Sequence, residues 1–131
     1  MKKSIQLINN YHIYYYAQTG NHVTAMPKKF NEKCYELLKQ IPSGKIVTYG
    51  DIAHALNSKA YQAVGNAMAA NPNPIIVPCH RVVKGNGEVG NYALGIDRKI
   101  ELLRNEGVKI ADDKVADFNA VRFQFRENAS N

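Results

Sequence analysis

Near the middle of this 131-residue chain lies the stretch IIVPCHRVV, residues Ile75 to Val83. It places a cysteine directly before a histidine, between a proline and an arginine, at the end of an apolar run. The thiolate is the reactive form of cysteine, and cationic or basic neighbours such as His80 and Arg81 favour it by lowering the thiol pKa. Cys79 is therefore a candidate nucleophile. The alternative is a buried structural thiol.

The composition is that of a single globular domain. Apolar residues make up 45% of the chain and charged residues 21%, and a chain of this length can bury roughly 68% of the surface that it exposes when unfolded. Its apolar runs are far shorter than the ~20 residues of a membrane helix, and its start has no signal-peptide pattern. We therefore expect an intracellular protein with no membrane partner.

The two cysteines are too few for a disulfide scaffold. The cysteines and histidines also lack the paired spacings that zinc prefers, so we expect no metal. Cys34 lies on the apolar stripe of an expected helix and reads most simply as a small core residue. A redox pair of Cys34 and Cys79 is geometrically possible, although no CxxC motif supports it.

The positive charge is concentrated in one segment. The formal net charge is +6, and residues 26–84 hold eight basic and three acidic residues, so five of the six surplus charges lie there. Such a concentration suits a polyanion, because Lys and Arg that neutralise phosphates release condensed counterions. A merely solubilising surface explains the charge equally well.

The order of expected elements predicts an α+β fold. Residues 1–26 predict a small β-meander with strands at Ser4–Ile8, Tyr11–Ala17 and His22–Ala25. After Pro27, apolar residues at helical spacing predict a helix from Phe30 to Ile41. We expect residues 1–26 to pack as a short β segment on one main domain, residues 27–131.

Two short helices are expected next. Thr48, with Asp51 three residues later, resembles a capping box that opens a helix ending near Leu56, and a second helix runs from about Ala60 to Ala70. Short helices joined by a tight polar turn are typical of a helix-turn-helix, although any αα-hairpin gives the same pattern.

The last third of the chain predicts smaller elements. Lys84–Glu88 is typical of a hairpin turn, and a helix from Asp97 to Asn105 is ended by Gly107. Strand-like pieces follow at Val108–Ile110 and at Val121–Phe125, where apolar residues alternate.

Several segments together carry a family resemblance. They are the central stretch, Gly44–Gly50 (GKIVTYG), Ala63–Pro72 (AVGNAMAANP), Gly90–Tyr92 (GNY) and Arg104–Gly107 (RNEG). Between Pro27 and Gly107 the chain resembles the O6-alkylguanine-DNA alkyltransferase family. The resemblance implies a mainly helical, winged-helix-like domain that repairs DNA once, because its cysteine takes the alkyl group from guanine O6 and keeps it.

The resemblance also implies roles for five residues. Cys79 is the alkyl acceptor, His80 takes its proton through a water, and Glu106 orients the imidazole. Asn71 braces the active-site turn. Tyr49 gives a proton or hydrogen bond to the guanine ring nitrogen as the alkyl group departs. No cofactor is implied.

The implied partner is double-stranded DNA that contains O6-alkylguanine. The helix from Ala60 enters the minor groove and the target nucleotide is flipped out. The DNA-binding residues implied are Lys59, Tyr61, Gln62, Gly65, Ala69 and Arg81, and those of the substrate pocket are Val82, Tyr92, Ala93 and Leu94. We expect a monomer in the cytoplasm, or in the nucleus if the host is a eukaryote.

The chain departs from the family pattern at two sites. Gln62 stands where the family usually has an arginine that fills the gap left by the flipped nucleotide, which predicts weaker duplex binding, with Tyr61 as a substitute wedge. Ala93 and Leu94 stand where Ser and Gly are common, which predicts a preference for methyl over bulky adducts such as benzyl. The segment before Pro27 is shorter than the family's N-terminal domain and lacks the zinc ligands of some members.

Two other functions compete with repair. A lesion-binding sensor, like the alkyltransferase-like proteins, flips the base without reacting, but those proteins have another residue in place of the cysteine. A generic helix-turn-helix regulator explains the charge but gives no reason for Cys79, His80 or Glu106.

Overall fold

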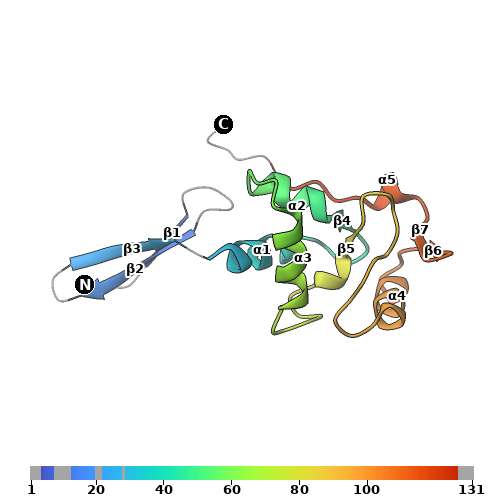
Figure 1. Ribbon diagram of the computed structural model, residues 1–131, viewed down its shortest axis with the longest axis horizontal. Coiled ribbons are helices and arrows are strands. Elements are labelled where there is room, and N and C mark those ends of the chain that lie inside the picture. The colour runs from blue at the N-terminus through green and yellow to red at the C-terminus, as the bar shows by residue number, and fades with distance from the viewer. Residues whose placement is uncertain (1–3, 8–12, 20–21, 28, 127–131) are drawn as a thin grey trace.

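The computed structural model describes residues 4–7, 13–19, 22–27 and 29–126, with side chains described in the last of these ranges. Figure 1 shows its elements, which are β1 (Ser4–Leu7), β2 (Ile13–Thr19), β3 (His22–Pro27), α1 (Phe30–Leu38), β4 (Val47–Thr48), α2 (Tyr49–Ala55), α3 (Tyr61–Ala69), a 3₁₀ turn (Cys79–Arg81), β5 (Val82–Val83), α4 (Ile96–Asn105), β6 (Ile110–Ala111), β7 (Lys114–Val115) and α5 (Phe118–Val121). This mixture confirms the α+β class. Within the described ranges, no helix is long and apolar enough to cross a bilayer.

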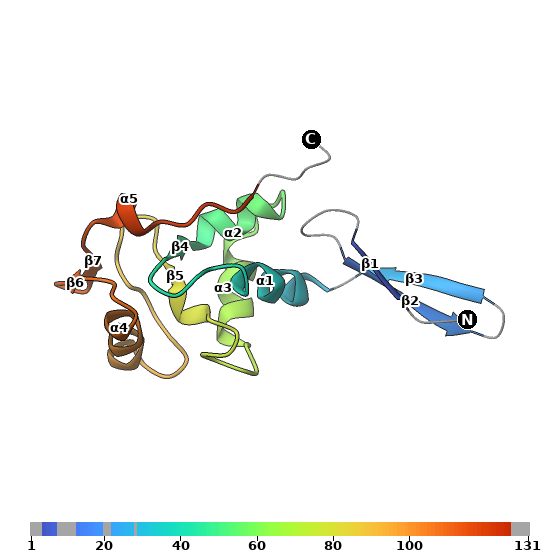
Figure 2. The same ribbon diagram turned by 180° about the vertical axis from the view of Figure 1, so that it is seen from behind.

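The N-terminal meander is confirmed, while Ile8, Tyr11 and His12 of the expected strands lie outside the described residues. Strands β1, β2 and β3 form an antiparallel sheet in chain order, in which Ser4 pairs with Tyr16 and Thr19 with His22. Figures 1 and 2 show this sheet at one end of the molecule, beyond the start of α1 and apart from the other helices. Packing of the segment on the main domain stays a prediction, which this arrangement does not support.

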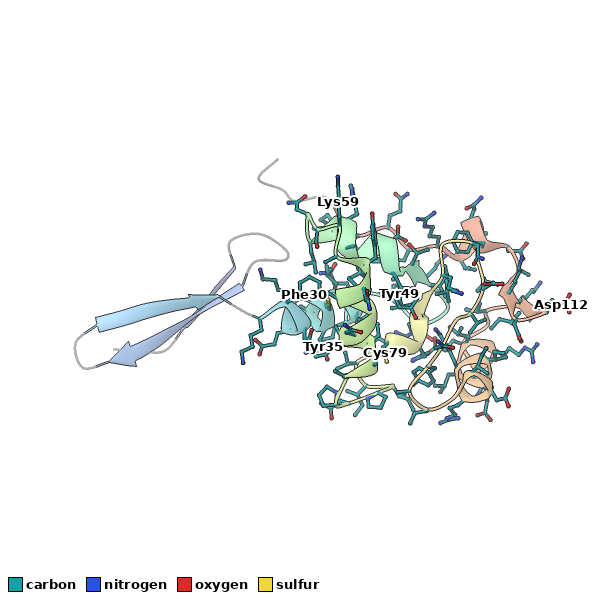
Figure 3. All side chains as sticks on the ribbon, viewed as in Figure 1. Phe30, Tyr35, Tyr49, Lys59, Cys79 and Asp112 are labelled. Carbon is teal, nitrogen blue, oxygen red and sulfur yellow. The ribbon has the colours of Figure 1, made fainter. Side chains whose placement is uncertain are left out.

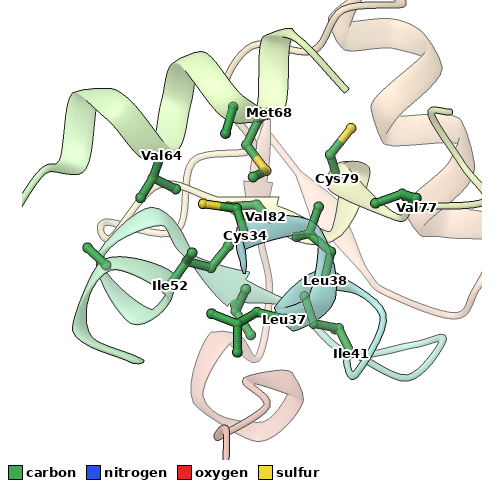
Figure 4. Packing of buried hydrophobic residues seen from close by; sticks show 13 residues of the cluster. Cys34, Leu37, Leu38, Ile41, Ile52, Val64, Met68, Val77, Cys79 and Val82 are labelled. Carbon is green, nitrogen blue, oxygen red and sulfur yellow. The ribbon is translucent and has the colours of Figure 1, made fainter. Parts of the chain in front are cut away.

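The main core is built by three helices. The buried stripe of α1 consists of Cys34, Leu37 and Leu38, with Ile41 just beyond the helix, as the spacing predicted. It meets the buried residues of α2 and α3, which are Ile52, Ala53, Val64, Ala67 and Met68, and Val82 of β5 (Figure 4). The helices α2 and α3 form the predicted helix-turn-helix pair on this core.

A capping box fixes the start of α2. The Thr48 hydroxyl accepts a hydrogen bond from the Asp51 amide, and the Asp51 carboxylate accepts one from the Thr48 amide, each 3.0 Å long. The helix ends before Asn57, whose φ of 53° lies in the left-handed region that asparagine tolerates. Both ends of α2 are thus set by local sequence.

A parallel pairing joins distant parts of the chain. Val47 of β4 pairs with Val82 of β5, and Thr48 pairs with Val83. The pairing ties the segment before α2 to the segment that follows the 3₁₀ turn.

A second core lies beneath α4. It contains Ile46, Val83, Val89, Leu103, Val108, Ile110 and Val115. Gly107 adopts a φ of 95° immediately after the C-cap of α4, which is the helix-stopping role that its position predicted. The second core therefore holds the C-terminal end of α4, where Glu106 lies, against β5.

The predicted strands of the tail are partly wrong. In place of a strand over 121–125, α5 ends at Val121 and the chain continues extended, with one isolated bridge between Ile46 and Arg122. The alternating apolar residues Phe123 and Phe125 still pack against the main core. An extended backbone formed, but no partner strand lies beside it along its length. Of the piece over 108–110, only Ile110 is in a strand, β6.

We predict that Thr48→Ala lowers the free energy of unfolding by about 1–2 kcal/mol, because it removes the cap of α2 at a buried position. Urea denaturation followed by circular dichroism measures this. The matched control is Ser43→Ala at an exposed position, which changes stability by less than about 0.5 kcal/mol. Equal stability of the two variants would contradict the role assigned to the cap.

Candidate active site

Cys79 opens the 3₁₀ turn that follows Pro78 and is only 3% exposed. The turn is braced by Asn71, whose Nδ2 donates to the Val77 carbonyl at 2.7 Å and whose Oδ1 accepts from the Asn73 amide at 3.0 Å. Asn71 is itself buried. Its two bonds fix the chain that leads into the turn, which is the arrangement that the expected bracing role requires.

His80, next in the turn, is held by Glu106. The imidazole Nε2 lies 3.0 Å from Glu106 Oε2, and the histidine is fully buried. Arg81 holds the same carboxylate from the other side, through Nε to Oε1 at 2.9 Å and a terminal nitrogen to Oε2 at 2.6 Å. A further Arg81 nitrogen donates to the Ile41 carbonyl at 2.7 Å. The turn is thus locked to the end of α4 and to the chain beyond α1.

The electrostatics of this network fix the state of His80. Burial acts to raise the pKa of Glu106, but hydrogen bonds from Arg81 and His80 outweigh it, and the net shift is downward. An ionised carboxylate only accepts hydrogen bonds, so Nε2 carries the proton. Burial lowers the pKa of His80 below its ordinary 6.5, although Glu106 opposes this. At neutral pH the ring is therefore neutral, with a bare Nδ1.

The other imidazole nitrogen of His80, Nδ1, is free to accept a proton. It is buried and has no hydrogen-bond partner among the residues of 29–126. The ring packs edge-on to Tyr92 at 6.4 Å between centroids, and the Tyr92 hydroxyl is likewise buried and unpartnered there. A buried base with a free lone pair next to the thiol-bearing residue suits proton removal from Cys79.

The thiol requires such a base. Burial raises the pKa of Cys79 above its ordinary 9.0, while the Asn71 amide and the Lys99 ammonium partly offset this. The resting side chain is therefore a neutral thiol at pH 7. Burial and the neighbouring Cys79 also raise the pKa of Tyr49, which keeps this phenol protonated and able to donate.

A cavity of about 600 Å³ opens beside Cys79, between α3 and the loop that follows β5. Eight of the expected site residues line it: Tyr49, Tyr61, Gln62, Gly65, Ala69, Cys79, Tyr92 and Ala93. Figure 3 shows Tyr49 and Cys79 together beside α3. Tyr61 is 56% exposed and therefore lies at the rim.

Other expected site residues lie elsewhere. The Arg81 guanidinium, expected on DNA, is occupied by Glu106 and the Ile41 carbonyl. Val82 has its side chain in the main core and not in the cavity wall. Leu94 and Lys59 are exposed outside the lining.

Four lining residues were not expected at the site, namely Met68, Lys84, Gly90 and Asn91. Gly90 has a φ of 81°, and a Cβ there would lie 3.3 Å from Lys84 Cγ and 3.7 Å from the Tyr49 hydroxyl. The glycine therefore keeps this side of the cavity open at a backbone conformation that other residues rarely adopt.

Lys99, in α4, is the other residue that sequence reasoning missed. It is fully buried, and its Nζ donates to the Asn91 carbonyl at 3.1 Å. The sequence held a signal for it, because Lys99 precedes Leu103 by four positions and so lies on the apolar face of the helix. A lysine at such a position is unusual.

A redox pair of the two cysteines is not supported. Both belong to the main core, but their sulfur atoms lie on separate sides of it and point in different directions (Figure 4). Burial raises the pKa of Cys34 to about 11, so this thiol is inert at neutral pH. Among the described residues, no group of three or more His, Cys, Asp or Glu side chains is placed to hold a metal ion.

Comparison with known proteins agrees with this geometry. Residues 29–108 match the family described as 6-O-methylguanine DNA methyltransferase, DNA binding domain. The methylated-DNA–protein-cysteine methyltransferase of Thermococcus kodakarensis is 53% identical over 81 residues, which are 61% of this chain and 45% of that protein. The Escherichia coli bifunctional transcriptional activator/DNA repair enzyme Ada is 45% identical over 78 residues, 59% of this chain and 22% of that protein. The chain thus spans less than half the length of these relatives.

Solved structures show the same fold. Mycobacterium tuberculosis OGT in complex with DNA gives a TM-score of 0.59 at 41% identity, covering 60% of this chain and 50% of that one. Atl1 of S. pombe, in complex with damaged DNA containing O6-carboxymethylguanine, gives 0.64 at 29% identity, covering 72% and 94%. Since the family match extends over more than half of its residues, this chain belongs to the 6-O-methylguanine DNA methyltransferase family.

Proposed function

We propose that this protein repairs DNA by moving the alkyl group of O6-alkylguanine, chiefly methyl, onto Sγ of its own Cys79. The observation that carries the proposal is the position of Cys79 in the wall of the cavity, directly before a buried histidine whose Nδ1 is free and whose Nε2 is bound to Glu106. Base and orienting acid thus form one hydrogen-bonded pair, and the nucleophile directly precedes the base in the chain.

The transfer is a displacement at a saturated carbon. The thiol proton passes to Nδ1 of His80, directly or through a water, and the sulfur lone pair forms a bond to the alkyl carbon. The bond from that carbon to O6 breaks, and its electron pair goes to the purine, which takes up a proton. Tyr49, a protonated phenol in the cavity wall, is placed to supply that proton or a hydrogen bond.

The reaction ends with the first turnover. The product on Cys79 is a thioether, which has no acyl or phosphoryl centre for water to attack. No residue of the network is placed to remove an alkyl group from sulfur. Each chain therefore repairs one base, and the protein is a stoichiometric reagent.

One wall of the cavity suits contact with DNA. Its α3 wall carries small residues, Gly65 and Ala69, that permit close approach of a nucleic acid backbone. Reaching O6 inside a duplex requires base flipping, which costs a few kcal/mol. The exposed Tyr61 at the rim has the size to fill the gap left in the stack. This function places the protein with the DNA, in the cytoplasm or in a eukaryotic nucleus, and we expect it to act as a monomer.

A lesion sensor is the second candidate. The similarity to Atl1, 94% of which is covered, favours it. Cys79 and the bound histidine favour repair, because a sensor that only binds a flipped base needs neither a thiol nor a base to ionise it.

Mass spectrometry separates the two candidates. After mixing with a duplex that contains O6-methylguanine, we expect one methyl group per chain, located on the Cys79 peptide and absent from Cys79→Ala. Cys34→Ala is the matched control and reacts like the original chain, because Cys34 lies in the core away from the cavity. Lesion-specific binding with no adduct would contradict repair and support the sensor.

Gln62 and Tyr61 generate a separate prediction. Tyr61→Ala weakens binding to lesion duplex about tenfold, because stacking on an aromatic ring contributes ~1–3 kcal/mol per base. Gln62→Arg strengthens binding and speeds repair, because a guanidinium adds a cation and a planar stacking surface. Single-turnover rates and affinities on duplex DNA test both variants.

Free O6-methylguanine is the control substrate for these variants, because no gap has to be filled when the base is not in a duplex. Both variants react with it at the rate of the original chain. Unchanged duplex repair in both variants would show that neither side chain takes the place of the flipped nucleotide.

A further inference from the structure

The fully buried lysine of α4 has no part in the mechanism above. Lys99 is 0% exposed, although lysine is almost never fully buried without a partner of opposite charge. None of the ion pairs formed within residues 29–126 includes it. Burial lowers its pKa to about 8, so the side chain is still mostly an ammonium at pH 7. Burying a charged ammonium is energetically unfavourable, so we expect Lys99 to have a function at this position.

The surroundings of Lys99 all belong to the candidate site. Its Nζ donates to the Asn91 carbonyl at 3.1 Å and lies 5.9 Å from the centre of the Tyr49 ring. Asn91 and Tyr49 both line the cavity. The titratable groups that interact with its charge are Tyr49 from α2, and Cys79 and His80 from the 3₁₀ turn.

We propose that the Lys99 ammonium, held by the Asn91 carbonyl, is the positive charge that stabilises the Cys79 thiolate formed during alkyl transfer. Lys99 is a positioning residue, because it contacts the wall of the cavity and does not line the cavity itself. The alkyl-transfer part of this inference rests on the proposed function, but the effect on the thiolate can be measured without DNA.

The charges in the site show what Lys99 adds. When His80 takes the thiol proton, Arg81, Glu106 and the new imidazolium together carry one positive charge, which balances the thiolate. The imidazolium is hydrogen-bonded to Glu106 through Nε2, so part of its charge is drawn away from the sulfur. The Lys99 ammonium supplies a second cation near the buried thiolate and favours the ionised sulfur further. Once the sulfur forms its bond to carbon and the electron pair of the C–O6 bond leaves with the purine, Lys99 faces a neutral thioether.

The pH range of the effect follows from the sign of the shift. Lys99 carries its charge below a pKa of about 8 and loses it above. Stabilisation of the thiolate is therefore present at neutral pH and disappears as the pH rises through 8 to 9. A purely structural role, such as tethering the loop at Asn91, would not follow this titration.

Three variants separate the charge from the hydrogen bond. Lys99→Gln keeps an N–H donor without charge, Lys99→Met removes both, and Lys99→Arg keeps the charge. Arg98→Gln is the matched control, because it removes a charge from the exposed side of the same helix. The readout is the rate at which iodoacetamide alkylates Cys79 between pH 6 and 10, followed on the Cys79 peptide by mass spectrometry.

At pH 7 we expect Lys99→Gln and Lys99→Met to be alkylated about fivefold or more slowly than the original chain, while Lys99→Arg and Arg98→Gln stay within about twofold. The deficit closes above pH 9, where Lys99 is neutral. Equal rates in all variants, or a deficit that is the same at every pH, would overturn the inference. Thermal unfolding verifies that each variant is folded.

A reciprocal measurement covers the case in which the uncharged variants do not fold. In the original chain labelled with ¹³C-lysine, NMR should show that Lys99 keeps its proton to a higher pH than in Cys79→Ser, because the thiolate raises the pKa of Lys99. An identical titration in the two proteins would overturn the inference. The methyl-transfer assay is independent: if methyl transfer is absent while the alkylation pattern holds, the proposed function fails and the role of Lys99 stands.

Discussion

The carboxylate of Glu106 receives hydrogen bonds from two consecutive residues of one short turn, His80 and Arg81, and it lies at the C-cap of α4. This one group fixes the imidazole tautomer, because an ionised carboxylate can only accept. It also anchors the turn to α4, while Arg81 extends the anchor to the chain beyond α1 through the Ile41 carbonyl. The turn has only three residues, so an anchor on His80 and Arg81 also fixes the orientation of the Cys79 side chain.

The remaining architecture brings the other participants to this point. The parallel pairing of β4 with β5 ties the start of α2 to the chain that follows the turn, and Tyr49 lines the same cavity as Cys79. The helix α3 forms another wall of that cavity. Burial then gives the site its chemical character. It holds His80 neutral and Cys79 protonated at rest, so the nucleophile forms only when the base takes its proton. The buried Lys99 adds a second positive charge to that of the histidine network.

The sequence predicted the parts of the site that depend on short spacings. Cys79 and His80 are adjacent, the capping box at Thr48 is local, and the resemblance connected Glu106 to them across 26 positions. What the sequence could not predict depends on long-range packing. Arg81 was expected to contact DNA, but the fold shows its guanidinium bound to Glu106. Lys99 shares a helix face with Leu103, but only the fold shows that this face is buried next to the cavity wall. Apolar residues alternate in the tail as they do in a strand. A strand also requires a neighbouring strand, and only the tertiary structure shows whether one is present.

The protonation state of His80 tests the account most directly, because base, orienting acid and thiol all depend on it. Nitrogen-15 NMR of the imidazole distinguishes the two tautomers and the imidazolium. The account predicts a neutral ring at pH 7 with its proton on Nε2, and a pKa below the ordinary 6.5. A proton on Nδ1, or a charged imidazolium at pH 7, would leave no base for the Cys79 proton and would contradict the mechanism.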